Sequence, residues 1–67
     1  MLQLKYELDR RRMKQVSLTR ATGIHEASIS RIVNAKEEAY SGRARRIADA
    51  LGWERDPSEL FRELEVK

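Results

Sequence analysis

Apolar residues recur along the chain three and four positions apart, which is the spacing of one face of a helix. The pattern predicts helices over residues 2–12, 15–22, 26–33, 42–51 and 57–65. The side chains expected to face inward are Leu4, Leu8, Met13, Leu18, Ala21, Thr22, Ile29, Ile32, Val33, Ala44, Ile47, Ala48, Leu51, Leu60, Phe61 and Leu64. Short turns join these segments, so residues 1–67 are predicted to form one compact, all-α, five-helix domain.

The ends of the predicted helices carry unequal signals. Gly23 and Gly52 follow the second and fourth segments, in the position where a left-handed residue costs least. Ser41 is the expected N-cap of the fourth segment. The third segment opens after His25, a weaker or different cap, and closes at residues 34–36 without a glycine. The third helix is therefore the one whose ends the sequence explains least.

The charge is distributed unevenly. The net charge is +3, but residues 1–36 carry eight basic and three acidic side chains, whereas residues 37–67 carry six and eight. A basic first half favours a polyanionic partner, although many solvated helical proteins show the same imbalance. The Asp9–Arg12 run is more often a solvated helix end than a phosphate clamp, and arginines near a helix C-terminus are also favoured by the helix dipole.

Composition excludes several classes of function. The chain has no cysteine and one histidine, so no disulfide and no cysteine or histidine metal cluster is expected. No glycine-rich phosphate loop, nucleophile with a neighbouring base, or carboxylate in an apolar pocket is visible, so we expect no enzyme and no cofactor. No apolar run approaches the ~20 residues of a membrane span, and the charged N-terminus is no signal peptide. We therefore expect a cytoplasmic protein.

The stretch QVSLTRATGIHEASISRIV, residues 15–33, meets the requirements of a DNA-reading unit. A short helix must enter a major groove about 12 Å wide, and a second helix must hold it there through a tight turn. Leu18 anchors the first helix, Gly23 makes the turn and Ile24 fills its inner side. Ile29 and Ile32 anchor the second helix. Its outward residues are small or polar, as base contacts require.

These residues resemble the phage repressor and Cro-type (XRE) helix-turn-helix family. Residues 13–36 read MKQVSLTRATGIHEASISRIVNAK, similar to the family pattern L-[ST]-Q-x-x-L-A-x-x-x-G-[VI]-[ST]-x-x-x-[IL]-S-x-[IL]-E-x-G-K. Downstream, RRIADALGW resembles the fourth helix of the family and PSELF its fifth. The chain departs from the pattern at His25, Thr19, Val33 and Ala35, at the early Met13, and at an extra Arg-Asp before the last helix.

The resemblance implies which residues meet DNA. The positions that would face bases are Glu26, Ala27, Ser28 and Arg31, and those that would touch phosphates are Gln15, Asn34, Lys36 and Arg43. The fork of Arg31 can pair with both major-groove acceptors of a guanine. Glu26 could accept from a cytosine amine or form an ion pair within the protein, and Ala27 could touch a thymine methyl. Arg45 and Arg46 could also flank DNA.

The last predicted helix, residues 57–65, opens on the strongest start signal in the chain, with Asp56 as N-cap, Pro57 at the first position and Glu59 at the capping-box position. One short reading helix makes few contacts, so we expect a homodimer on a near-palindromic operator. The candidate dimer surface is Leu60, Phe61, Leu64 and Val66.

The expected function is a sequence-specific transcriptional regulator, bacterial or phage-encoded and bound to the nucleoid, that represses by occluding double-stranded DNA. Two alternatives stay open: an antitoxin that also binds a toxin protein, and a restriction–modification controller.

Overall fold

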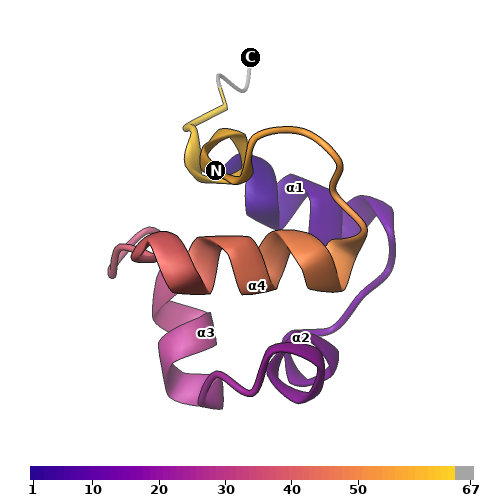
Figure 1. Ribbon diagram of the computed structural model, residues 1–67, viewed down its shortest axis with the longest axis vertical. Helices are drawn as coiled ribbons and strands as arrows, with labels where there is room; N and C mark the ends of the chain where they lie inside the picture. Colours follow the sequence, from indigo (N-terminus) through magenta and orange to yellow (C-terminus); the bar gives the residue numbers. More distant parts are fainter. Residues whose placement is uncertain (65–67) are drawn as a thin grey trace.

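A computed structural model describes residues 1–64, apart from the side chain of Ser41. The elements are α1 (Gln3–Arg10), α2 (Gln15–Thr22), α3 (Glu26–Val33), α4 (Ser41–Leu51) and the 3-10 helix η1 (Pro57–Phe61). Helix α4 crosses the middle of the molecule, with α1 and η1 on one side and α2 and α3 on the other (Figure 1). Helix α2 packs against α3 and α4, and η1 packs against α4 and α1. The predicted all-α fold is confirmed.

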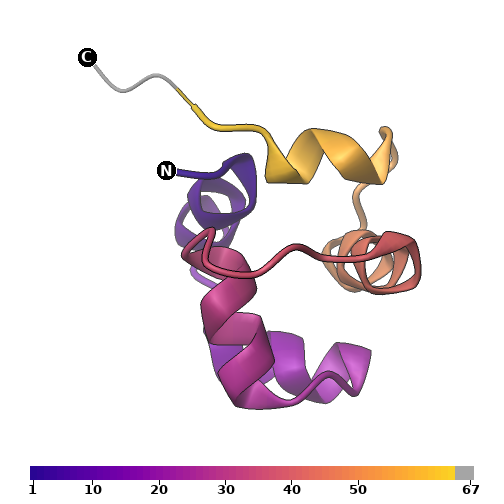
Figure 2. The same cartoon turned by 90° about the vertical axis from the view of Figure 1, so that its left-hand side faces the viewer.

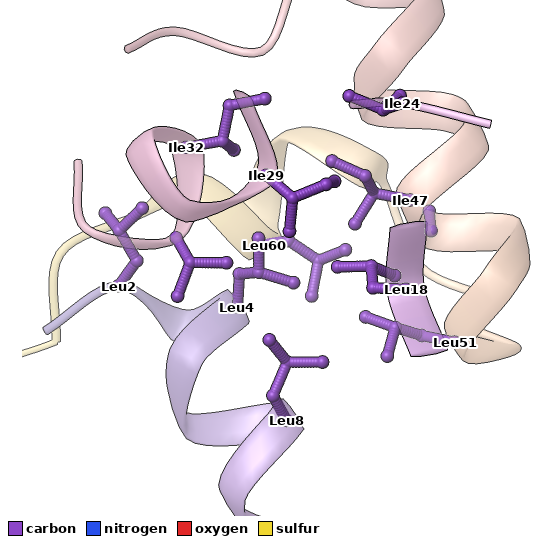
Figure 3. Close-up of a cluster of buried hydrophobic side chains, with 12 residues drawn as sticks. Leu2, Leu4, Leu8, Leu18, Ile24, Ile29, Ile32, Ile47, Leu51 and Leu60 are labelled. Atoms are coloured by element: carbon purple, nitrogen blue, oxygen red, sulfur yellow. The ribbon is translucent and has the colours of Figure 1, made fainter. Parts of the chain in front are cut away.

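The core is one cluster of branched apolar side chains that come from all of the helices and pack against one another (Figure 3). The fully buried ones are Leu4, Leu18, Ile29, Ile32, Ile47 and Leu60. Burying such a side chain stabilises the folded state by about 1.5–3 kcal/mol relative to leaving it exposed to water. The inward placement of Ala21 was wrong, because Ala21 is exposed, and Thr22 takes the buried position four residues after Leu18.

The end of α1 and the start of α4 differ from the predicted bounds. Helix α1 ends at Arg10 because Arg12 adopts a left-handed conformation, with φ of 53°, and the Met13 N–H turns back to the Leu8 carbonyl. Helix α4 begins at Ser41, so Tyr40 and not Ser41 holds the N-cap position. Tyr40 is 72% exposed and makes no side-chain capping bond.

The last helix is shorter and tighter than predicted. Asp56 is the N-cap, as expected, and its carboxylate accepts a hydrogen bond from the Ser58 N–H at 2.9 Å. Glu59 pairs with Arg55 instead of closing a capping box. The helix is of the 3-10 type and ends at Phe61.

Backbone bonds to the N-terminal segment explain this early end. The Gln3 N–H donates to the Arg62 carbonyl at 2.9 Å, and the Leu64 N–H donates to the Met1 carbonyl at 2.8 Å. These bonds require extended chain after Phe61, and Arg62 has φ and ψ of −80° and 141°. The predicted residue 65 of the helix and the dimer-surface residue Val66 lie outside the described residues.

Glu7 is a buried carboxylate of α1 that binds side chains at both ends of the helix. Glu7 is only 4% exposed. Its carboxylate accepts hydrogen bonds from Arg10 at 2.8 Å, Arg11 at 3.2 Å and Gln3 at 3.0 Å. Arg11 also donates to the Leu51 carbonyl at the end of α4. Part of the Asp9–Arg12 run is therefore structural. The hydrogen bond from Arg10 lowers the pKa of Glu7 below its ordinary value of 4.5, against the opposing effect of burial.

We expect this network to be lost in acid. A carboxylate whose pKa is lowered by folding stabilises the protein above its unfolded pKa, and the stabilisation disappears as the pH falls through the folded value. The free energy of unfolding should therefore decrease as the pH is lowered through about 4.5 and below. Glu7→Gln should make this decrease in acid shallower, while destabilising the protein at neutral pH. Urea unfolding followed by circular dichroism across pH 3–7 measures both effects. An acid limb as steep in Glu7→Gln as in the parent would contradict the assignment.

No helix among the described residues is both long and apolar enough to cross a membrane.

Candidate nucleic-acid interface

Helices α2 and α3 are joined by a turn that needs glycine. Gly23 has φ of 74° and ψ of 7°, the left-handed region, and its N–H donates to the Thr19 carbonyl at 2.9 Å. A side chain here would meet no neighbouring atom, so the requirement is backbone strain and not space. The turn sends the chain directly from the last residue of α2 into Ile24, which is 4% exposed.

Thr22 ties this turn to the helix before it. Its hydroxyl donates to the Leu18 carbonyl at 2.7 Å and accepts from the Ile24 N–H at 3.2 Å. Both bonds are buried. The sequence placed Thr22 only on the inward face, and nothing in the helical spacing distinguishes an anchoring hydroxyl from an ordinary core contact.

Helix α3 has one anchored face and one open face. Ile29, Ile32 and Val33 are at most 2% exposed and hold the helix against the core. Ala27 and Arg31, four residues apart, lie on the opposite face and are exposed. Glu26 is exposed at the first turn, and Ser28 is half-buried at the edge of the face. Ala27 and Arg31 thus form the open face of a helix that Figure 2 shows along its length, with Glu26 and Ser28 on either side of that face.

His25 caps the start of α3. Its Nδ1 accepts a hydrogen bond from the Ala27 N–H at 3.1 Å, and its carbonyl accepts from the Ile29 N–H at 3.0 Å. A ring nitrogen can accept only in the neutral imidazole, so the proton lies on Nε2 in this arrangement. The different cap anticipated from the sequence is therefore a histidine side chain that does the work of the usual Ser or Thr.

The end of α3 is closed by a residue in an unusual conformation. Ala35 has φ of 61°, its N–H donates to the Ile32 carbonyl at 3.1 Å, and the Lys36 N–H donates to the Arg31 carbonyl at 2.8 Å. These two bonds form a Schellman motif, in which glycine is the usual residue. The Asn34 side chain adds a bond to the Ser30 carbonyl at 2.8 Å. Helix α3 therefore has a full C-terminal cap without a glycine.

We expect Ala35→Gly to stabilise the protein. Alanine is about 1–2 kcal/mol less favourable than glycine in the left-handed region, and part of this is offset by the greater freedom of glycine in the unfolded chain. The net gain should be about 0.5–1 kcal/mol, measured as a higher midpoint of urea unfolding.

The reverse change at Gly23, Gly23→Ala, is the matched control and should destabilise by a similar amount, because it introduces the same strain into open space. A lower unfolding midpoint for Ala35→Gly would show that the left-handed conformation of Ala35 is not what limits this cap.

One carboxylate joins two of the predicted DNA-contacting arginines. Glu37 accepts from Arg31 Nε at 3.1 Å through Oε1 and from Arg43 Nη1 at 3.1 Å through Oε2. Arg31 Nη2 also lies 3.4 Å from the Ser28 hydroxyl. The structure thus brings together α3, the loop after it and the first turn of α4. Sequence reasoning missed Glu37, because loop residues follow no periodicity that would place them beside a helix face.

The remaining predicted phosphate-contacting residues lie at the start of α2 and after α3, and no hydrogen bond joins them to one another in the part of the chain that the structure describes. Gln15 is the first residue of α2, and Lys14 before it provides no side-chain cap. The first N–H groups of α2 are therefore left without a capping side chain, as an anion-binding helix start requires. Lys36 is exposed directly after Ala35. Arg45 and Arg46 are exposed on α4.

The predicted dimer-surface residues differ in what they offer. Leu60 is fully buried in the core of its own subunit, so its side chain presents nothing to a second copy, and its assignment to a dimer surface was wrong. The cause is that η1 packs against both α1 and α4, and Leu60 belongs to the core cluster that these helices share. Phe61 and Leu64 are half-buried and keep part of their surface exposed.

Within residues 1–64 no group of three or more histidine, aspartate or glutamate side chains is arranged to hold a metal ion.

Comparison with known proteins agrees with this geometry. The family model of the Cro/C1-type helix-turn-helix DNA-binding domain matches residues 3–62. No curated protein and no solved structure matches the chain. The match covers α1 through η1, including the α2–turn–α3 unit that the sequence resemblance identified. The chain is a DNA-binding regulator and belongs to the Cro/C1-type helix-turn-helix family.

Proposed function

We propose that the protein is a homodimeric repressor that blocks transcription by occupying a near-palindromic operator. The observation that carries the proposal is the exposed face of α3, where Ala27 and Arg31 stand on a helix anchored by three buried side chains. The small side chains of Ala27 and Ser28 leave room for the helix to approach base edges, and Arg31 provides the fork that suits guanine.

Base reading is assigned to Glu26, Ala27, Ser28 and Arg31, and phosphate contact to Gln15, Asn34, Lys36 and Arg43. The proposal is supported by the exposure of Lys36 and of 42% of the Arg43 side chain, which leaves both cations accessible at the border of α3. The uncapped start of α2 supplies backbone N–H groups and a positive dipole end for a phosphate. Phosphate contacts of this kind fix orientation, and base contacts add the specificity.

Dimerisation is proposed because one eight-residue reading helix makes few contacts. A two-fold dimer doubles them and places the two α3 helices about one helical turn apart, ~34 Å. Phe61 and Leu64 are the candidate interface residues, since part of their apolar surface is exposed. The protein would act by occlusion, and no residue points to an antitoxin or controller role in preference.

Selection of bound duplexes from a random-sequence DNA pool tests the proposal, with sedimentation of the selected complex as the second measurement. We expect enrichment of a two-fold symmetric sequence with half-sites about 34 Å apart, bound by two copies of the chain. An operator of this kind, placed over a promoter, should lower transcription in a purified system. Enrichment of no sequence would overturn DNA reading, and an asymmetric site bound by one copy would overturn the dimer.

A further inference from the structure

We infer that Glu37 is a specificity-determining residue that positions Arg31 for base reading; this inference rests on the proposed reading role of Arg31. Glu37 lies in the loop between α3 and α4 and contacts no base itself in this assignment. It acts through the guanidinium that it holds, and it links that guanidinium to Arg43 on the next helix.

The edge of the guanidinium that Glu37 occupies is the important detail. Oε1 of Glu37 takes the Nε–H at 3.1 Å, and the Ser28 hydroxyl lies 3.4 Å from Nη2 on the α3 side. Arg31 retains unpaired N–H groups at the end of its fork, on Nη1 and Nη2. A guanine presents two acceptors at a matching separation, and an end-on fork can bind both. The ion pair therefore restrains the side chain while leaving its reading end available.

Restraint matters because the Arg31 side chain is otherwise free. It is 51% exposed on an outward helix face, and a free arginine loses rotamer entropy when it becomes fixed. If Glu37 fixes it beforehand, less of that entropy is lost on binding, and the guanine contact discriminates more strongly.

The second carboxylate oxygen of Glu37 makes the loss of this side chain act differently on overall DNA affinity and on the preference for guanine. Oε2 accepts from Arg43, a residue assigned to phosphate contact, so the carboxylate offsets positive charge at the edge of the site. Removing that charge should strengthen binding to every duplex, since more cationic charge then faces the phosphates. The same change should weaken the preference for guanine. These opposite signs separate positioning from simple charge.

The test compares Glu37→Gln, Glu37→Asp and Glu38→Gln on the selected operator and on duplexes altered at the Arg31 contact position. For Glu37→Gln we expect a salt dependence steeper by about one unit of slope and a guanine preference reduced about three- to tenfold. Glu37→Asp keeps the charge but shortens the reach, so the preference should fall while the salt slope stays unchanged. Glu38 is the neighbouring exposed glutamate, with no ion pair among the described side chains, so Glu38→Gln should leave the preference intact.

Each outcome decides the matter. If Glu37→Gln tightens binding to all duplexes equally and the guanine preference stays at the parent level, Glu37 is only a charge and the inference fails while base reading by Arg31 stands. If Arg31→Ala itself leaves the guanine preference unchanged, the reading role fails and positioning fails with it. Melting temperatures of the variants, measured in parallel, exclude loss of the fold as the cause.

Discussion

Replacing Ile29 by alanine is expected to leave the protein mostly unfolded at physiological temperature. Ile29 is fully buried and faces the core from the centre of α3. Truncating a buried isoleucine to alanine costs about 2–5 kcal/mol, because apolar contacts are lost and a cavity is left. A single core in a chain this small supplies only about 3–5 kcal/mol of net stability. Thermal melting by circular dichroism measures the loss.

Ile29→Val is the matched control for this prediction. It keeps a branched side chain, removes one methylene, and should cost about 0.5–1.5 kcal/mol, so the protein should stay folded and bind DNA. Ile29→Ala should also lose DNA binding, since Ile29 is one of the three buried side chains that hold α3 against the core. A melting temperature within a few degrees of the parent for Ile29→Ala would show that the core repacks around the vacancy.

Much of the fold could be predicted from the sequence, because the apolar residues in the middle of the chain recur with a strong helical periodicity. The bounds of α2 and α3 agree with the prediction, and Gly23 and Gly52 take the left-handed conformation that their positions suggested. The errors lie where long-range contacts override local preference. Backbone bonds from Arg62 and Leu64 to the N-terminal segment end η1 early, and no local pattern announces them.

The two unexpected left-handed residues illustrate a second limit. Arg12 and Ala35 occupy the conformation that glycine usually supplies. Each closes a helix through backbone bonds to the last turn: the Met13 N–H donates to the Leu8 carbonyl after α1, and the Lys36 N–H donates to the Arg31 carbonyl after α3. Residue type alone gives no sign of this conformation, because it is the tertiary structure that selects it.

The candidate site follows the same division. The outward residues of α3 could be placed from spacing, since the buried isoleucines define the opposite face. Glu37 could not be placed, because it reaches Arg31 across a loop whose course depends on the cap at Ala35. The loop therefore determines which charges surround Arg31, while the helix determines where Arg31 stands.

Substitution of Arg31 is expected to have the largest effect on the sequence preference of DNA binding. Arg31→Ala should relax the preference at one base pair of each half-site and cost about 1–3 kcal/mol on the guanine-containing duplex, because the proposed bidentate contact would be lost. Arg31→Lys retains the charge but not the planar fork, so it should keep most of the affinity for unrelated DNA and still lose the preference. Binding constants on duplexes carrying each base at that position measure the difference.

Lys36→Ala is the contrasting variant, since Lys36 is assigned to a phosphate and follows the C-terminal cap of α3. It should weaken binding to all sequences alike and lower the salt slope by about one. The two variants therefore separate direct readout from backbone contact by the pattern of loss and not by its size. Equal loss on every duplex for Arg31→Ala would place Arg31 among the phosphate contacts, and base reading would then rest on the first turn of α3.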